Sequence, residues 1–137
     1  MLDLIIKNGK CYIDGQLKDV NISVKDGKIQ KIGQITEDAK DTIDATGLIV
    51  LPGCMDTQTH FREPGSTDTE DLHSGSRAAI VGGITSVFEM PNTNPPTSNK
   101  VEFQKKIDLA KNRMYCNYAF YFGATADNAN EIANLKK

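Results

Sequence analysis

The chain has 137 residues, of which 39% are hydrophobic and 25% are charged, and its formal net charge is −2. This composition is typical of a globular domain, and the scattered basic residues exclude a nucleic-acid footprint or a basic membrane-binding patch. No apolar run approaches the roughly 20 residues of a membrane-spanning helix, and the N-terminus lacks a secretory signal, so we expect a cytoplasmic protein.

Residues 1–50 consist of short runs rich in β-branched residues, and glycines interrupt them. Three dipeptides are typical of hairpin turns: Asn8-Gly9, Asp14-Gly15 and Asp26-Gly27. The alternation of Val20, Ile22 and Val24, followed by Ile29 and Ile32, predicts an antiparallel β unit with one buried face. About 50 residues are few for an independent core, so we expect this unit to pack on another part of the protein.

After residue 50 the pattern changes to alternating strands and helices. We predict strands over residues 54–61, 84–91 and 115–125, and helices over 69–83, over 100–114 and from 127 onward. Asn99 and Glu102 have the spacing of a capping box, and Phe103, Ile107 and Ala110 form the apolar face of the helix that follows. Repeated β/α units indicate a parallel sheet with right-handed crossovers. The third helix has no cap, so we expect a fragment of a longer chain.

The three cysteines, Cys11, Cys54 and Cys116, are widely spaced. They match neither a disulfide framework nor a zinc-knuckle spacing, so we expect reduced and mostly buried thiols. His73 is predicted on a helix surface, and the acidic run at 67–71 is typical of a helix N-terminus rather than of a calcium loop.

Polar residues occupy every second position directly after an apolar run: Asp56, Gln58, His60 and Arg62. In a strand such residues share one face, and ligands bind near the C-terminal ends of parallel strands. His60 is therefore a candidate metal ligand, although from spacing alone a hydrogen-bonded structural histidine is the more common explanation. Spacing also leaves other roles open, namely a salt bridge for Arg62 and an Asx-turn for Asn92.

Residues 52–95 carry a dense, ordered set of motifs: Pro-Gly at 52–53, Asp56, His60, Arg-Glu-Pro-Gly at 62–65, Ala-Ala at 78–79, Gly-Gly-Ile-Thr at 82–85 and Met-Pro-Asn-Thr-Asn-Pro at 90–95. The set resembles the dihydroorotases of the amidohydrolase superfamily. The resemblance implies an α/β fold, the N-terminal part of a metal-dependent (β/α)8 TIM-like barrel with a small β-sandwich side domain. Residues 1–50 would form the sandwich segment and residues 51–137 the first three β/α units. A complete barrel runs to about 250 residues, so the barrel is expected to be incomplete here.

The resemblance also implies roles for single residues. His60 matches a zinc ligand, and Arg62 and Asn92 match residues that hold a substrate carboxylate, for which a guanidinium fork is well suited. Gln58 departs from the pattern, because it stands where the family has its first histidine ligand, and an amide oxygen is a poorer zinc ligand than imidazole. Three roles stay open for Gln58: a weak ligand, a residue behind the ligands, or the mark of a lost site.

The activity that the resemblance implies is the reversible cyclisation of N-carbamoyl-aspartate to dihydroorotate in pyrimidine biosynthesis. One or two zinc ions would activate water and polarise the ring carbonyl. Further ligands and the general base would follow on later strands, so no catalytic residue is assigned here and the chain alone is expected to be inactive. The expected partner is a small-molecule substrate, neither nucleic acid nor membrane, and the full-length protein is expected to form a homodimer.

Two further functions compete with this interpretation. Allantoinases and dihydropyrimidinases share the fold and much of the first strand, although Arg62 and Asn92 favour a substrate with a carboxylate. A non-catalytic dihydroorotase-like scaffold subunit is the second alternative, and Gln58 keeps it open.

Overall fold

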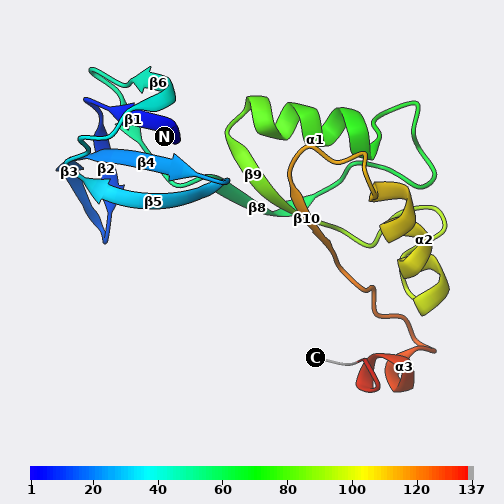
Figure 1. Ribbon diagram of the computed structural model, residues 1–137. Helices are drawn as coiled ribbons and strands as arrows, with labels where there is room; N and C mark the ends of the chain where they lie inside the picture. Colours follow the sequence, from blue (N-terminus) through cyan, green and yellow to red (C-terminus); the bar gives the residue numbers. More distant parts are fainter. Residues whose placement is uncertain (136–137) are drawn as a thin grey trace. The chain divides into compact units, whose positions relative to one another are not determined.

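The computed structural model describes residues 1–135 and divides the chain into two compact units, the first over Met1–Pro52 and the second starting at Gly53 (Figure 1). The first unit contains seven strands: β1 (Leu2–Lys7), β2 (Lys10–Ile13), β3 (Gln16–Asp19), β4 (Asn21–Lys25), β5 (Lys28–Gly33), β6 (Ala39–Asp44) and β7 (Ile49–Val50). They form two sheets with the strand orders β5-β4-β1-β6 and β3-β2-β7.

Two of the three predicted hairpin turns are confirmed. Asp14-Gly15 joins the antiparallel pair β2 and β3, and Asp26-Gly27 joins β4 and β5. All four turn residues have φ between 51° and 78°, as a type I′ turn requires. The prediction for Asn8-Gly9 is wrong, because β1 pairs with β4 and β6 and not with β2. Asn8 instead carries the chain from one sheet to the other, and its left-handed φ of 64° explains the turn-like sequence.

The sheets of the first unit are mixed, which corrects the expectation of a purely antiparallel unit. β6 pairs in parallel with β1, and β7 pairs in parallel with β2. The predicted buried face is also only partly present. Ile22 is buried, whereas Ile29 and Ile32 are 62% and 46% exposed.

The second unit places three parallel strands in the order β10-β9-β8, as the β/α pattern predicts. Its elements are β8 (Cys54–Thr59), α1 (Leu72–Val81), β9 (Ile84–Glu89), α2 (Lys100–Ala110), β10 (Asn117–Phe120) and α3 (Ala129–Ala133). Helix α1 packs on β9 and on α2. The buried apolar core is formed by Phe61, Leu72, Val87, Ala110 and Cys116. Within the described residues, no helix is long and apolar enough to cross a membrane.

The two long helices begin at side-chain caps. Asp71 forms a capping box with Ser74 at the start of α1, and Asn99 accepts a hydrogen bond of 2.9 Å from the Glu102 amide at the start of α2. The Glu102 carboxylate binds Lys105, so the capping box predicted at Asn99 is only half formed. Of the cysteines, Cys11 and Cys116 are buried, whereas Cys54 is exposed.

Gly75 allows α1 to lie directly against Phe61. A Cβ at Gly75 would lie 2.8 Å from Phe61 Cε1 and closer still to Cδ1. We expect Gly75→Ala to lower the free energy of unfolding by about 1–3 kcal/mol, as overpacked cores do, measured by urea denaturation. Gly82→Ala is the matched control, because Gly82 has a φ of −79° and no neighbour closer than 3.5 Å to an added Cβ. An equal loss in both variants would contradict the packing argument.

Candidate functional site

The candidate site lies where β8 ends. From Gln58 onward the burial fits the predicted alternation: Gln58 is exposed, Thr59 and Phe61 are buried and His60 is half-buried, whereas Thr57 is exposed and does not fit it. The strand is shorter than predicted, because β8 stops at Thr59 and His60 follows it directly. The backbone of Arg62 then turns into the left-handed region with a φ of 62°. Arg62 therefore owes its direction to this turn and not to the strand alternation.

His60 and Asn92 come from neighbouring strand ends and contact each other. His60 Nδ1 lies 3.0 Å from Asn92 Oδ1. An amide oxygen can only accept, so this contact is a hydrogen bond in the tautomer that carries the proton on Nδ1, and in that neutral ring Nε2 presents a lone pair. Ligand histidines commonly donate their other ring N–H to such an acceptor, which fixes the ring orientation. The Asx-turn alternative for Asn92 is not formed within the described residues.

Arg62 is exposed, and within residues 1–135 its side chain has no ion pair or hydrogen-bond partner. The alternative of a salt bridge to Glu63 or Asp68 is therefore not supported. Glu63 instead forms a two-pronged pair with Arg113, at 2.8 and 3.1 Å, and accepts the Leu72 amide at 2.9 Å. This buried carboxylate raises the pKa of Arg113. It ties the loop after Arg62 to the start of α1 and to the turn that follows α2, and among residues 1–135 the Arg62 guanidinium has no partner.

Gln58 occupies the remaining predicted position. Its backbone N–H donates to Asp56 Oδ1 at 2.9 Å, and its side chain has no hydrogen-bond partner in the described part of the chain. Tyr121 donates its hydroxyl to the Thr57 carbonyl at 3.1 Å, so a side chain from beyond β10 holds the backbone next to Gln58. The sequence analysis did not identify Tyr121, because this contact joins residues 64 positions apart.

The residues fit one part of a metal site. His60 offers a free Nε2 whose orientation Asn92 fixes, and Gln58 offers an amide oxygen. Within residues 1–135, however, no group of three or more His, Cys, Asp or Glu residues could hold a metal ion. The chain can therefore supply one good zinc ligand and one weak one, and tetrahedral coordination needs further donors.

A buried ion pair lies directly behind this site, and the sequence analysis missed it. Glu89 ends β9 and pairs with Lys106 of α2, with side chains 1% and 0% exposed. Glu89 Oε1 accepts the Phe61 amide at 3.2 Å, and Lys106 Nζ donates to the Met90 carbonyl at 3.0 Å. Burial raises the pKa of Glu89 and lowers that of Lys106, while each partner opposes the shift of the other.

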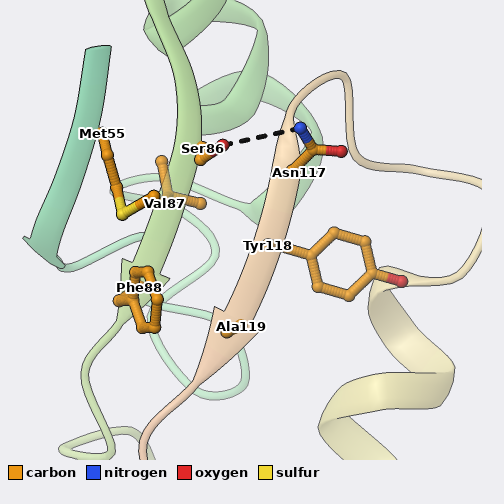
Figure 2. A pocket seen from close by; sticks show the side chains of 7 residues that line it. All are labelled: Met55, Ser86, Val87, Phe88, Asn117, Tyr118 and Ala119. Carbon is orange, nitrogen blue, oxygen red and sulfur yellow. Dashed lines mark hydrogen bonds between the residues drawn. The ribbon is translucent and has the colours of Figure 1, made fainter. Parts of the chain in front are cut away.

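A shallow depression lies on the middle of the same sheet and is separate from the candidate site (Figure 2). Ser86 and Phe88 pair in register with Asn117 and Ala119, so the four side chains share the face opposite buried Val87. Asn117 and Ser86 are joined by a hydrogen bond of 3.5 Å. The depression has a volume of about 170 Å³ and contains none of the predicted site residues.

Comparison with known proteins places this geometry in context. Residues 49–136 match the model of the Amidohydrolase family. An allantoinase of Escherichia coli O1:K1 / APEC is 43% identical over 134 residues, which are 97% of this chain and 30% of that protein. The chain thus spans about 30% of the length of the curated relatives it matches.

Solved structures agree with this assignment. L-Hydantoinase (dihydropyrimidinase) from Arthrobacter aurescens is 35% identical with a TM-score of 0.87, and the match covers 96% of this chain and 30% of that one. D-Hydantoinase (dihydropyrimidinase) from Thermus sp. is 28% identical with a TM-score of 0.76, covering 93% and 29%. The similar proteins are named allantoinases and hydantoinases, and the dihydroorotase interpretation stays a prediction.

Proposed function

The chain belongs to the amidohydrolase family, and we propose that it forms the first β/α units of a cyclic amidohydrolase that opens the ring of a neutral cyclic ureide such as allantoin or a hydantoin. The observation that carries the proposal is the His60–Asn92 hydrogen bond at the C-terminal edge of the parallel sheet. It leaves Nε2 of His60 as a metal donor at the position where ligands bind in such sheets. The names of the similar proteins favour a ureide ring over dihydroorotate.

The family is generally metal-dependent, and we propose zinc as the metal, with His60 and, more weakly, Gln58 among its ligands. A bound zinc ion would polarise the ring carbonyl and activate the attacking water. Asn92 holds the His60 ring in one orientation, so that no rotation is needed when metal binds. Arg62, which is exposed and has no side-chain partner among residues 1–135, can donate to polar atoms of the substrate and orient the ring.

The proposal is tested by the turnover of the full-length protein on three ring substrates. We expect kcat/KM to be highest for allantoin, compared with dihydrouracil and dihydroorotate. A preference for dihydroorotate would replace the proposal with the dihydroorotase alternative, which unpaired Arg62 favours. Absence of ring opening with all three and with hydantoin would support the non-catalytic scaffold, which Gln58 favours.

Arg62 separates the two enzyme functions further. Hydrogen bonds to charged groups contribute about 1.5–3 kcal/mol, so Arg62→Met should lower kcat/KM for carboxylate-bearing dihydroorotate by about 10- to 100-fold. For neutral allantoin we expect a change of less than about tenfold. Steady-state kinetics on both substrates measure the difference, and Arg77→Met, which removes an exposed arginine of α1, is the matched control. Equal losses on both substrates would show that Arg62 does not contact a carboxylate.

A further inference from the structure

The ends of β8 and β9 are not held together by the sheet alone. The ladder between them ends with a hydrogen bond from the Met90 amide to the Thr59 carbonyl at 2.9 Å, and the loops beyond are joined once more, by the Asn94 amide and the Pro64 carbonyl at 3.0 Å. His60 follows Thr59, and Asn92 lies two residues beyond Met90. Both side chains of the candidate site therefore project from backbone that has left the ladder, yet their polar atoms meet at 3.0 Å.

The buried pair of Glu89 and Lys106 connects these two segments. The Glu89 carboxylate accepts a hydrogen bond from the backbone N–H of Phe61, the residue after His60. The Lys106 ammonium donates to the carbonyl of Met90, on the path to Asn92. Because the two side chains also pair with each other, a continuous chain of polar contacts runs from the His60 side of the site to the Asn92 side.

Stability alone does not account for this arrangement. Two fully buried charges carry a large desolvation penalty, and apolar residues of similar size commonly give equal or greater stability. Glu89 Oε2 is the oxygen that pairs with Lys106, and it has no other polar partner in the described structure, so its compensation depends on Lys106 alone. An apolar pair could neither accept a hydrogen bond from the Phe61 amide nor donate one to the Met90 carbonyl.

We propose that Glu89 and Lys106 are positioning residues, which hold the ends of β8 and β9 so that Asn92 fixes the orientation and tautomer of His60. The inference rests on the proposed function for its catalytic meaning. Its structural content concerns the His60 ring in the chain itself and is measured without metal, substrate or turnover. The proposed function can therefore fail while this inference holds, and the reverse is also true.

The experiment uses the metal-free full-length protein with ¹⁵N-labelled histidine, in which the signals of His60 and His73 are assigned by their loss in His60→Ala and His73→Ala. His73 is exposed and serves as the internal reference. NMR of the wild type should show His60 with a proton on Nδ1 and none on Nε2, and with slow exchange of that proton. Glu89→Leu/Lys106→Met removes one negative and one positive charge, so the net charge is unchanged. In this variant we expect the His60 ring to exchange between its two tautomers, as we expect of exposed His73. The Phe61 amide should exchange its hydrogen about tenfold faster, because it has lost one hydrogen bond.

Two further variants keep the test decisive. In Glu102→Leu/Lys105→Met, which removes the ion pair between exposed Lys105 and partly buried Glu102 from the same helix, both signals should match the wild type. In Glu89→Gln/Lys106→Met an acceptor for the Phe61 amide remains, so that amide should again exchange as slowly as in the wild type. The His60 Nδ1 proton should exchange at a rate between those of the wild type and the apolar variant. If the apolar variant does not fold, the Glu89→Gln/Lys106→Met variant is sufficient for the test. The proposal then predicts that its His60 Nδ1 proton exchanges faster than in the wild type. Wild-type tautomer and exchange at His60 in a folded variant that lacks the pair would overturn the proposal.

Discussion

His60→Ala is expected to lower kcat/KM of the full-length protein for its ring substrate by on the order of 10³-fold. A metal that polarises a carbonyl contributes several kcal/mol to the transition state, and each 1.36 kcal/mol is about tenfold in rate. The loss of His60, the proposed ligand whose ring contacts Asn92, should remove most of that contribution. Steady-state kinetics with matched protein concentrations measure the effect.

His73→Ala is the matched control for this prediction. His73 is exposed on α1, where its ring contacts Tyr115 edge-on at 5.1 Å, and its removal should leave kcat/KM within about twofold, since exposed substitutions away from the site have small effects. Comparable losses for the two histidines would show that His60 has no special role. Unchanged activity in His60→Ala would remove it from the metal site.

Lys106→Met is expected to cause the largest loss of stability of any single change discussed above. The change leaves the Glu89 carboxylate buried without its partner, and the loss of one member of a buried pair costs about 3–5 kcal/mol. Urea denaturation followed by circular dichroism at pH 8 measures this loss. Lys105→Met, in which the removed lysine is exposed and pairs with Glu102 on the surface, should cost less than about 1 kcal/mol.

The loss in Lys106→Met should shrink as the pH falls. Burial already raises the pKa of Glu89 above its ordinary 4.5, and Lys106 opposes that rise. Without Lys106 the native state binds a proton that the unfolded state releases, so the free energy of unfolding increases as the pH falls through the raised pKa and levels off below about 4.5. The difference between Lys106→Met and Lys105→Met should therefore be smaller at pH 5 than at pH 8. A difference that grows toward pH 5 would contradict the assignment of the loss to ionised Glu89.

Local sequence was sufficient for the parts of the fold that local chemistry determines. Asp14-Gly15 and Asp26-Gly27 each join adjacent antiparallel strands, and the apolar pattern of β9 and α1 located both elements. Asn8-Gly9 has the same type of sequence, but it connects two strands of different sheets. A residue with left-handed backbone also occurs in such a connection. Which strand pairs with which is a long-range property that a dipeptide does not encode.

The candidate site was predictable in its residues but not in its contacts. The alternation after residue 55 pointed to Gln58 and His60, and the Asn92 motif followed the next long strand. The pairing of His60 with Asn92 depends on two loop ends that meet in space. Lys106 had no visible signal, because a lysine in an amphipathic helix is ordinarily solvated, and its partner Glu89 lies 17 positions earlier.

The metal content of the full-length protein, measured together with that of its Gln58→His variant, tests the central claim most directly. The claim is that His60, oriented by Asn92, is a metal ligand in a working cyclic amidohydrolase. We predict that the native protein carries at least one zinc ion per chain, that His60→Ala loses it, and that Gln58→His binds metal more tightly, since imidazole is the better zinc ligand. A native protein without metal and without activity, in which Gln58→His restores both, would contradict the claim and identify a scaffold subunit.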